Sequence, residues 1–156
     1  MDNPILGKNV SLIDKPNFGS EPYLIKIGDN TTISFGCSFV THDGATRVVR
    51  NLKNQNPQTV IYGPIVIGKN CFVGCNTTIL QNVHIGDNTI IGACSLVDKD
   101  IPSNVVAAGV PCRIICTLDE YIEKHKDEFE YMVKLPYEEK KKYLLNKFKD
   151  DLKWKK

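Results

Sequence analysis

The 156-residue sequence predicts a mainly β fold, a triangular parallel β-helix followed by a helical C-terminal tail. Three observations carry this prediction: a branched aliphatic residue at every sixth position, matching columns of corner-forming residues between them, and helical spacing after residue 116. A period of six fits neither a helix nor a lone strand, but it fits a strand followed by a turn. Three such units close one triangular coil.

The repeat consists of three columns in one register. The aliphatic column is Ile61, Ile67, Val73, Ile79, Ile85, Ile91 and Val97, after a shorter run of Ile27, Ile33 and Phe39. Three positions later come residues that tolerate positive φ at a corner, namely Asn30, Gly36, Asn70, Asn76, Asn82 and Asn88. Four positions later come small or β-branched residues, namely Thr31, Cys37, Cys71, Thr77, Val83, Thr89 and Ser95.

The repeat predicts a β-helical domain over residues 1–116 and a helical tail over residues 117–156. The period fails between Phe39 and Ile61, because their separation in the sequence is not a multiple of six. An excursion from the coil is therefore expected at about residues 43–60.

Two prolines mark the expected end of the coils. Pro102 and Pro111 remove backbone donors and are predicted to stop further strand growth. Thr117 and Glu120 then form a capping-box pattern that opens a helix, and Pro136 begins a second helical segment. The apolar residues expected on the first helix are Leu118, Tyr121, Ile122, Phe129, Met132 and Val133.

Composition and charge argue against several classes of function. The net charge is +2, no stretch of 18 apolar residues exists, and the N-terminus lacks a basic region followed by an apolar run. We therefore expect no signal peptide, no membrane span and a cytoplasmic protein. Residues 134–156 hold nine lysines against four acids, which favours a solvated helix face over a nucleic-acid or membrane surface.

The six cysteines are expected to be reduced thiols, because no secretion signal accompanies them. Cys37 and Cys71 stand in the small-residue column, where a thiol packs as a small hydrophobe. A zinc site formed by Cys71, Cys75, Cys112 and Cys116 is a weaker reading, because their spacing suits structural zinc poorly. No metal is predicted.

The sequence has three histidines, of which His42 is the candidate for chemistry. His125 falls in the tail, and His84 lies in a regular repeat where an outward side chain is ordinary. His42 stands at the root of the excursion, where a loop that interrupts a regular repeat suggests a purpose. From the pattern alone, a general base and a structural corner histidine are equally good readings.

The stretch from Ile27 to Ile115 resembles the hexapeptide-repeat acyltransferases, which have a left-handed parallel β-helix. It is most similar to the galactoside, maltose and capsular-polysaccharide O-acetyltransferase branch. The resemblance rests on three segments in order, SFVTHDGAT, IGKNCFVGCNTTILQNVHIGDNTIIGACSLVDKDIP and VVAAGVPCRII. The sequence departs from the branch at Phe72, where a Trp is common, and at Cys116, where a second Arg often follows.

The resemblance implies a mechanism and a set of site residues. His42 matches the histidine that deprotonates the acceptor hydroxyl, which attacks the acetyl-CoA thioester directly. The family's coenzyme-contacting positions fall on Cys75, Ala93, Lys99 and Arg113, the last two suiting the phosphates of the nucleotide end. The family also implies a homotrimer with each active site between two subunits. No metal is required.

Acceptor recognition is placed on Glu21, Tyr23 and Asp43. A coil of about 18 residues puts Glu21 and Tyr23 near His42, where they could bond sugar hydroxyls and stack on a ring, or simply form a polar turn. Asp43 is the nearest carboxylate in sequence that could orient the imidazole, and a backbone carbonyl of the excursion is an equal alternative.

The expected activity is acetylation of a sugar hydroxyl in a surface polysaccharide or its precursor. N-acetylation of an amino-sugar nucleotide is the alternative, because it would use the same base and coenzyme site. A γ-type carbonic anhydrase needs three zinc-binding histidines, and His42, His84 and His125 do not have the required placement. A non-catalytic scaffold would leave His42, Lys99 and Arg113 without a role.

Overall fold

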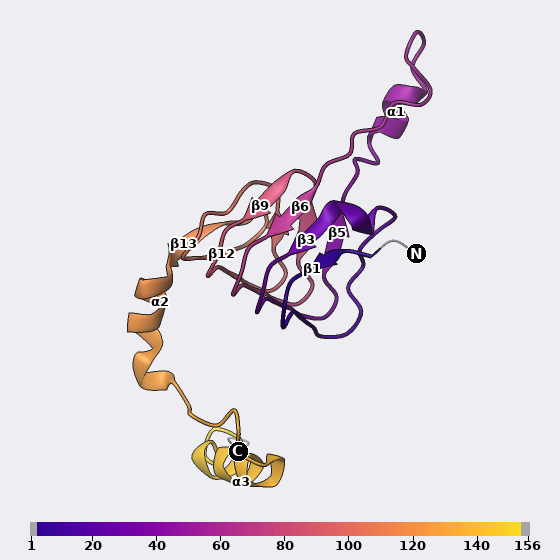
Figure 1. Cartoon of the computed structure of the whole chain (residues 1–156). Coiled ribbons are helices and arrows are strands. Elements are labelled where there is room, and N and C mark those ends of the chain that lie inside the picture. The colour runs from indigo at the N-terminus through magenta and orange to yellow at the C-terminus, as the bar shows by residue number, and fades with distance from the viewer. Residues whose placement is uncertain (1–2, 154–156) are drawn as a thin grey trace. The chain divides into compact units, whose positions relative to one another are not determined.

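Short parallel strands wind into a triangular prism in the computed structural model, which describes residues 3–153 (Figure 1). The first side contains β1 (Ile5–Leu6), β3 (Ile25–Ile27), β6 (Ile65–Ile67) and β9 (Val83–Ile85). The second contains β2 (Ser11–Leu12), β4 (Thr32–Ile33), β7 (Phe72–Val73), β10 (Ile90–Ile91), β12 (Val105–Ala108) and β13 (Arg113–Thr117). The third contains β5 (Ser38–Val40), β8 (Thr78–Leu80) and β11 (Leu96–Val97). The predicted left-handed parallel β-helix with C-terminal helices is confirmed.

One regular coil advances the sequence by 18 positions, as the side-chain hydrogen bond between the corner residues Asn70 and Asn88 shows. Each corner therefore stacks directly on the corner of the neighbouring coil. Glycine makes this contact possible: a Cβ atom added to Gly28 would lie 2.6 Å from the carbonyl carbon of Gly68. No side chain fits at that distance, so glycine at this corner sets the spacing of the coils.

The three sequence columns take their predicted places. The aliphatic column is buried with the exception of Ile61. The asparagine and glycine column adopts φ angles between 52° and 70° at the corners. The small-residue column is buried, and its polar members bond to the neighbouring coil, as Thr31 Oγ1 does in donating to the carbonyl of Gly68 at 2.9 Å.

Ile61 does not belong to the core, contrary to the prediction, because 49% of its surface is exposed. Phe39, which is 2% exposed and pairs with Ile79, takes its place on the third side. The count of six fails here because the excursion rejoins the coil only at Gly63. The first inward-facing residue after the excursion is Ile65.

A long insertion interrupts one corner of the prism between Thr41 and Gly63 and projects from it at the top of Figure 1. The coil that carries it advances the sequence by 40 positions, as the hydrogen bond between Thr31 and Cys71 shows, whereas a regular coil takes 18. The difference is the length of the insertion. The insertion contains the short helix α1 (Thr46–Arg50).

The two arms of the insertion leave the coil as an antiparallel pair. The amide of Asp43 donates to the carbonyl of Ile61, and the amide of Gly63 donates to the carbonyl of Thr41, each at 2.9 Å. Because this pairing begins at Thr41, the backbone at the root of the insertion is held by hydrogen bonds rather than free.

The coils continue past Pro102, which was predicted to end them. Ile101 pairs with Ile85 on the first side, and β12 then adds another strand to the second side. Pro102 is tolerated because it lies at a corner, where no strand partner needs its missing amide. The chain reverses at Gly109, with φ of 104°, and β13 returns antiparallel to β12.

The predicted capping box opens helix α2 (Leu118–His125). The amide of Thr117 donates to the Glu120 carboxylate at 2.8 Å, and the amide of Glu120 donates to Thr117 Oγ1 at 3.2 Å. The described residues divide into two compact units, the first ending at Glu123 and the second beginning at Lys124.

The rest of the tail is less helical than its apolar spacing predicts. After α2 come η2 (Lys126–Glu128), an irregular stretch over residues 129–136, and α3 (Tyr137–Lys147), which follows Pro136 as expected. Helices depend chiefly on packing of an apolar face, and Val133 in the irregular stretch is 98% exposed. Residues 154–156 of the basic run lie outside the described part of the chain.

The close approach of the corners gives a testable stability difference between two glycines. Gly28→Ala is expected to lower the free energy of unfolding by about 1–3 kcal/mol, because the new methyl would overlap the backbone of Gly68. Gly44→Ala is the matched control, because a Cβ added at Gly44 meets nothing within 4 Å. Urea denaturation of both variants measures the difference, and equal stabilities would contradict the role given to the corner glycines.

Candidate active site

Two successive coils build the corner that carries His42. The first coil advances the sequence by 21 positions, as the hydrogen bond between Asn9 and Asn30 shows, and a regular coil by 18. The extra residues lie at this corner, where they form the turn η1 (Pro22–Leu24). Glu21 precedes that turn and therefore stacks beneath His42.

A carboxylate holds one nitrogen of the His42 ring. Nδ1 of His42 lies 2.9 Å from Oε2 of Glu21, and Thr41 Oγ1 donates to the same oxygen at 2.8 Å. The Glu21 side chain is 12% exposed and the His42 side chain 42% exposed. The carboxylate is thus enclosed at the foot of the corner while the imidazole reaches the surface.

Glu21 is held as an anion. Burial pushes the pKa of this carboxyl upward, but hydrogen bonds from His42, Ser20 and Thr41 outweigh burial and lower the pKa below its usual value. An ionised Glu21 accepts a hydrogen bond from His42 Nδ1–H, which fixes the neutral ring as the Nδ1–H tautomer. The Nε2 atom is then the basic nitrogen of the ring.

Tyr62 flanks the imidazole on the returning arm of the insertion. His42 and Tyr62 face each other in the antiparallel pairing, and their ring centroids are 6.1 Å apart with the planes inclined by 63°. Cross-strand residues on one face stand side by side, so Tyr62 forms a wall beside the ring. Sequence reasoning missed Tyr62, because its partner strand can be assigned only once the insertion is folded.

Asp43 does not orient the histidine. Its carboxylate accepts a hydrogen bond from the amide of Ala45 at 2.8 Å and so forms the first turn of the insertion. Tyr23, in η1, is 52% exposed and follows Glu21 closely in the sequence. The partner of His42 is therefore Glu21, which the sequence suggested as a residue that binds the sugar acceptor or forms a polar turn.

Cys75 and Ala93 stack on one another at a different edge of the prism. The amide of Cys94 donates to the carbonyl of Cys75 at 2.8 Å, which joins the two corners. Within the described residues, the amides of Cys75 and Ala93 themselves donate to no backbone carbonyl. Two successive corners therefore present unpaired N–H groups, which fits the amide and carbonyl groups of a pantetheine arm.

Lys99 and Arg113 line one cavity of about 280 Å³. The Arg113 guanidinium donates to Asp98 at 2.9 Å and lowers the pKa of that carboxyl, while Lys99 is exposed. Two cations at one cavity suit a phosphate-bearing ligand, because Arg113 offers a fork of donors and Lys99 a point charge.

A single chain brings only some of the predicted site residues together. His42 and Lys99 lie on the edge between the third and first sides, two coils apart, whereas Cys75 and Ala93 lie on the edge between the second and third sides. Strand β8 separates the two edges. The segment of about six residues that joins these neighbouring corners spans at most about 20 Å, which bounds the separation of the two edges.

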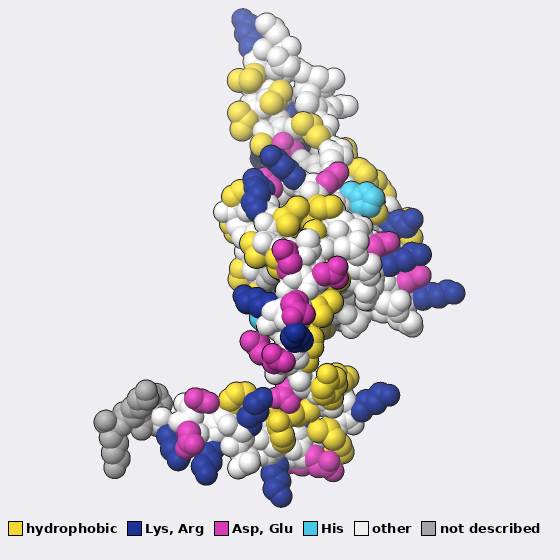
Figure 2. All heavy atoms as spheres, turned by 90° about the vertical axis from the view of Figure 1, so that its left-hand side faces the viewer, with side chains coloured by type: hydrophobic (Ala, Val, Ile, Leu, Met, Phe, Trp, Pro, Cys, Tyr) yellow, Lys and Arg dark blue, Asp and Glu magenta, His cyan; other side chains and the backbone are white. Residues whose placement is uncertain are grey.

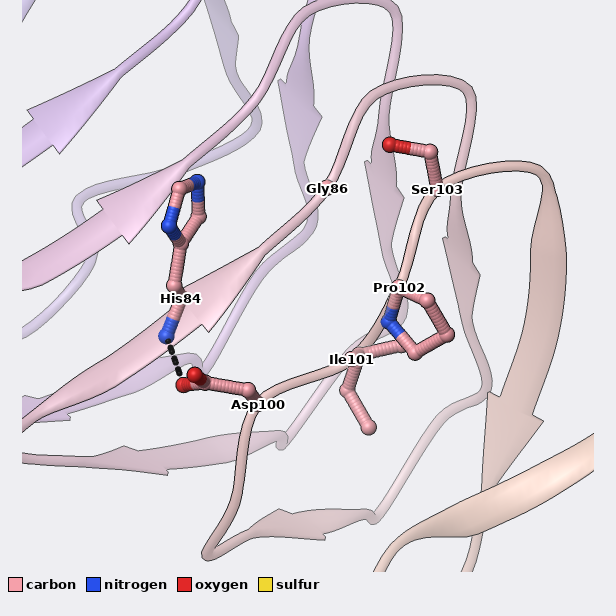
Figure 3. Close-up of a pocket in the computed structure, with 6 residues that line it drawn as sticks. All are labelled: His84, Gly86, Asp100, Ile101, Pro102 and Ser103. Carbon is pink, nitrogen blue, oxygen red and sulfur yellow. Dashed lines mark hydrogen bonds between the residues drawn. The ribbon is translucent and has the colours of Figure 1, made fainter.

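The other two histidines have different surroundings. His84 projects from β9 into a shallow cavity of about 370 Å³ (Figure 3), where its backbone amide, not its ring, bonds to Asp100 at 2.7 Å. His125 pairs with Glu128 at 2.8 Å in the tail. Of the three, only His42 combines a buried carboxylate with a place at the root of the insertion.

The six cysteines are free thiols, as predicted. Burial raises the pKa of Cys37, Cys71 and Cys112, which keeps them protonated inside the coils. Within residues 3–153, no three His, Cys, Asp or Glu side chains lie close enough to hold a metal ion. None of the helices found in that range is long and apolar enough to cross a membrane.

The lowered pKa of Glu21 predicts a pH-dependent contribution to stability. The contribution is present above the ordinary value of 4.5 and is lost as the pH falls through the lower value of the folded protein. Glu21→Gln is therefore expected to be less stable than the parent at pH 7, with the difference shrinking on acidification. Thermal unfolding of both proteins between pH 7 and pH 3 measures this, and a constant difference would contradict it.

Comparison with known proteins supports the architecture and the class of enzyme. Residues 56–99 match the family described as "Bacterial transferase hexapeptide (six repeats)". The chain is 45% identical over 139 residues to Protein CapG of Staphylococcus aureus, covering 89% of this chain and 79% of that protein. It is 42% identical over 105 residues to the galactoside O-acetyltransferase of Escherichia coli (strain K12), covering 67% of this chain and 49% of that protein.

The chain thus spans about half the length of the galactoside enzyme. Among solved structures it is similar to a galactoside acetyltransferase in complex with coenzyme A, with a TM-score of 0.56 and 31% identity. That likeness covers 83% of this chain and 60% of the other. The chain belongs to the bacterial hexapeptide-repeat acetyltransferases, enzymes whose acyl donor is acetyl-CoA.

Proposed function

We propose that the protein transfers the acetyl group of acetyl-CoA to a sugar hydroxyl, in a surface polysaccharide or its precursor, with His42 as general base. The observation that carries the proposal is the 2.9 Å contact between Glu21 and His42 Nδ1, which leaves Nε2 as the basic atom at an exposed corner. A sugar hydroxyl is a poor nucleophile at neutral pH, so a base must take its proton as the new bond forms.

The residues of the corner divide the chemistry between them. His42 Nε2 accepts the hydroxyl proton, and the Glu21 carboxylate stabilises the positive charge that then develops on the ring. Acetyl-CoA, when bound, supplies the activated acyl group: as the sugar oxygen bonds to the acyl carbon, the C–S bond of the thioester breaks, and the proton held by His42 goes to the departing thiolate. An unpaired amide such as that of Cys75 or Ala93 is the simplest donor to the negative charge that develops on the acyl oxygen. No serine or cysteine nucleophile is needed.

The acceptor side is rich in exposed aromatic groups. Tyr23 and Tyr62 are 52% and 55% exposed and lie on the two coils that carry Glu21 and His42. Aromatic faces stack on the apolar face of a sugar ring, which fits a saccharide acceptor. Glu21 is less suited to bind sugar hydroxyls than the sequence suggested, because Oε2 already accepts two hydrogen bonds. The name of the galactoside relative supports the same substrate class.

A cyclic homotrimer accounts for the separation of the two edges. The base lies on the edge between the third and first sides of the prism, and the Cys75 and Ala93 corners lie on the edge between the second and third sides. A neighbouring copy must therefore place its Cys75–Ala93 edge against the His42 edge of its partner. This is a heterologous contact, which closes into a ring. The insertion exposes Val48, Leu52, Ile61 and Tyr62, and several yellow side chains lie along one side of the projecting segment in Figure 2, as expected of a surface that a neighbour covers.

Removing the base tests the proposed chemistry. His42→Ala is expected to lower kcat by about 10²–10⁴-fold, the usual range for losing a general base, while the oligomer stays intact. Thiol release from acetyl-CoA in the presence of sugar acceptors measures the rate. His84→Ala is the matched control and is expected to keep its activity, so full turnover by His42→Ala would remove the mechanism.

Mixing two inactive variants tests whether each site is shared. His42→Ala removes the base, and Ala93→Trp fills the opposite edge. If subunits exchange at random in a 1:1 mixture, about a quarter of the contacts in a cyclic trimer join one intact edge of each kind. We expect activity to recover to about that fraction of the parent value, since each such contact is a complete site.

The mixed oligomers need to be formed by refolding the two variants together and checked by native mass spectrometry. Each variant alone, carried through the same treatment, is the control. A mixture that contains mixed trimers but shows no recovered activity would place the whole site within one subunit.

A further inference from the structure

The hydroxyl of Thr41 is a buried polar group that the proposed mechanism does not yet use. Thr41 is 1% exposed, and its Oγ1 donates to Glu21 Oε2 at 2.8 Å. The buried threonine hydroxyls of the small-residue column, to which Thr41 does not belong, are those of Thr31, Thr77 and Thr89, and they donate to backbone carbonyls of neighbouring coils. Thr41 instead donates to a carboxylate, so its role differs from the coil-to-coil bonding of the others.

The two donors meet on one oxygen of Glu21. Thr41 Oγ1 and His42 Nδ1 both lie within 2.9 Å of Oε2, although they belong to consecutive residues. A carboxylate held without Thr41, by His42 and Ser20, would keep more freedom to rotate about its terminal torsion. The second bond, from a hydroxyl whose backbone is fixed by Gly63, removes that freedom.

Among the described residues, the acceptor of the Thr41 hydroxyl is Glu21. The hydroxyl lies beside the backbone of Gly19, where an added Cβ atom would make an ordinary van der Waals contact of 3.9 Å with Oγ1. The Thr41 carbonyl is bonded to the amide of Gly63 at 2.9 Å, which fixes the backbone that carries this hydroxyl.

We propose that Thr41 is a positioning residue that locks Glu21 in place and thereby fixes the tautomer of His42. The inference rests on the proposed role of His42 as base. An anchored carboxylate accepts a hydrogen bond from Nδ1–H, so the single proton of the neutral ring stays on Nδ1 and Nε2 carries none. Without the Thr41 hydroxyl, Glu21 rotates away part of the time and the ring exchanges toward the Nε2–H tautomer, which cannot accept a proton from the sugar.

The test compares Thr41→Ser with Thr41→Ala, which differ only in the hydroxyl. Nitrogen-15 NMR of histidine-labelled oligomer, recorded where the ring is neutral, reports which ring nitrogen carries the proton. We expect Nδ1–H in the parent and in Thr41→Ser, and a mixture of tautomers in Thr41→Ala. We also expect kcat to fall roughly tenfold to a hundredfold in Thr41→Ala, the range for a lost hydrogen bond to a charged group, with KM for acetyl-CoA unchanged.

Thr31→Val is the matched control, because it deletes an equally buried hydroxyl that bonds to neighbouring coils and not to Glu21. It is expected to lower stability but to leave the tautomer and kcat as in the parent. If Thr41→Ser and Thr41→Ala share one tautomer and one rate, packing rather than the hydroxyl is responsible and the proposal is overturned.

The tautomer measurement separates this proposal from the proposed function. Undiminished activity of His42→Ala would refute the base, yet the ring nitrogen signals would still decide whether Thr41 positions Glu21. Conversely, a parent protein whose neutral His42 carries its proton on Nε2 would overturn the role of Thr41 while leaving the requirement for His42 intact.

Discussion

The structure depends on how closely one coil of the prism approaches the next. Most of the strands are too short to be stable alone, so each coil is held by its neighbours. The approach is limited at the corners, where a Cβ atom on Gly28 or Gly68 would come within 3 Å of the adjacent backbone. Asparagine at positive φ and a buried small residue complete each corner, and together they fix the register of the regular coils.

The candidate site arises where this regularity is broken twice at the same edge. The first coil is longer than a regular one there, and the next coil carries the insertion. The longer corner places Glu21 beneath His42, and the paired arms of the insertion place Tyr62 beside it. A regular corner would have supplied an asparagine instead, so the two irregularities provide what the repeat cannot.

The fold was accessible from sequence because each column has its own physical requirement. Inward aliphatics, positive-φ corners and small residues recur at fixed spacing, and within the regular coils all three proved to lie where the spacing put them. The count failed only across the insertion, where Ile61 kept the period of six but Phe39 and Ile65 fill the core. Periodicity cannot follow a chain through a segment that leaves the solenoid.

The arrangement at His42 was only partly accessible for a related reason. Sequence proximity offered Asp43 or a backbone carbonyl of the excursion as the orienting group, but Asp43 is used in the first turn of the insertion. Glu21 reaches the ring because the first coil is longer than the regular repeat. The spacing of the later coils does not reveal this extra length. The roles of Thr41 and Tyr62 depend on pairings that form only when the two arms come together.

The way the insertion leaves the prism has a consequence for its interior. Its arms are fastened by backbone hydrogen bonds between Asp43 and Ile61 and between Thr41 and Gly63, which do not depend on the side chains in between. The interior of the segment can therefore change in length and in composition without disturbing the register of the solenoid. A change of this one segment would alter the surface beside His42 while Glu21 and His42 stay where they are.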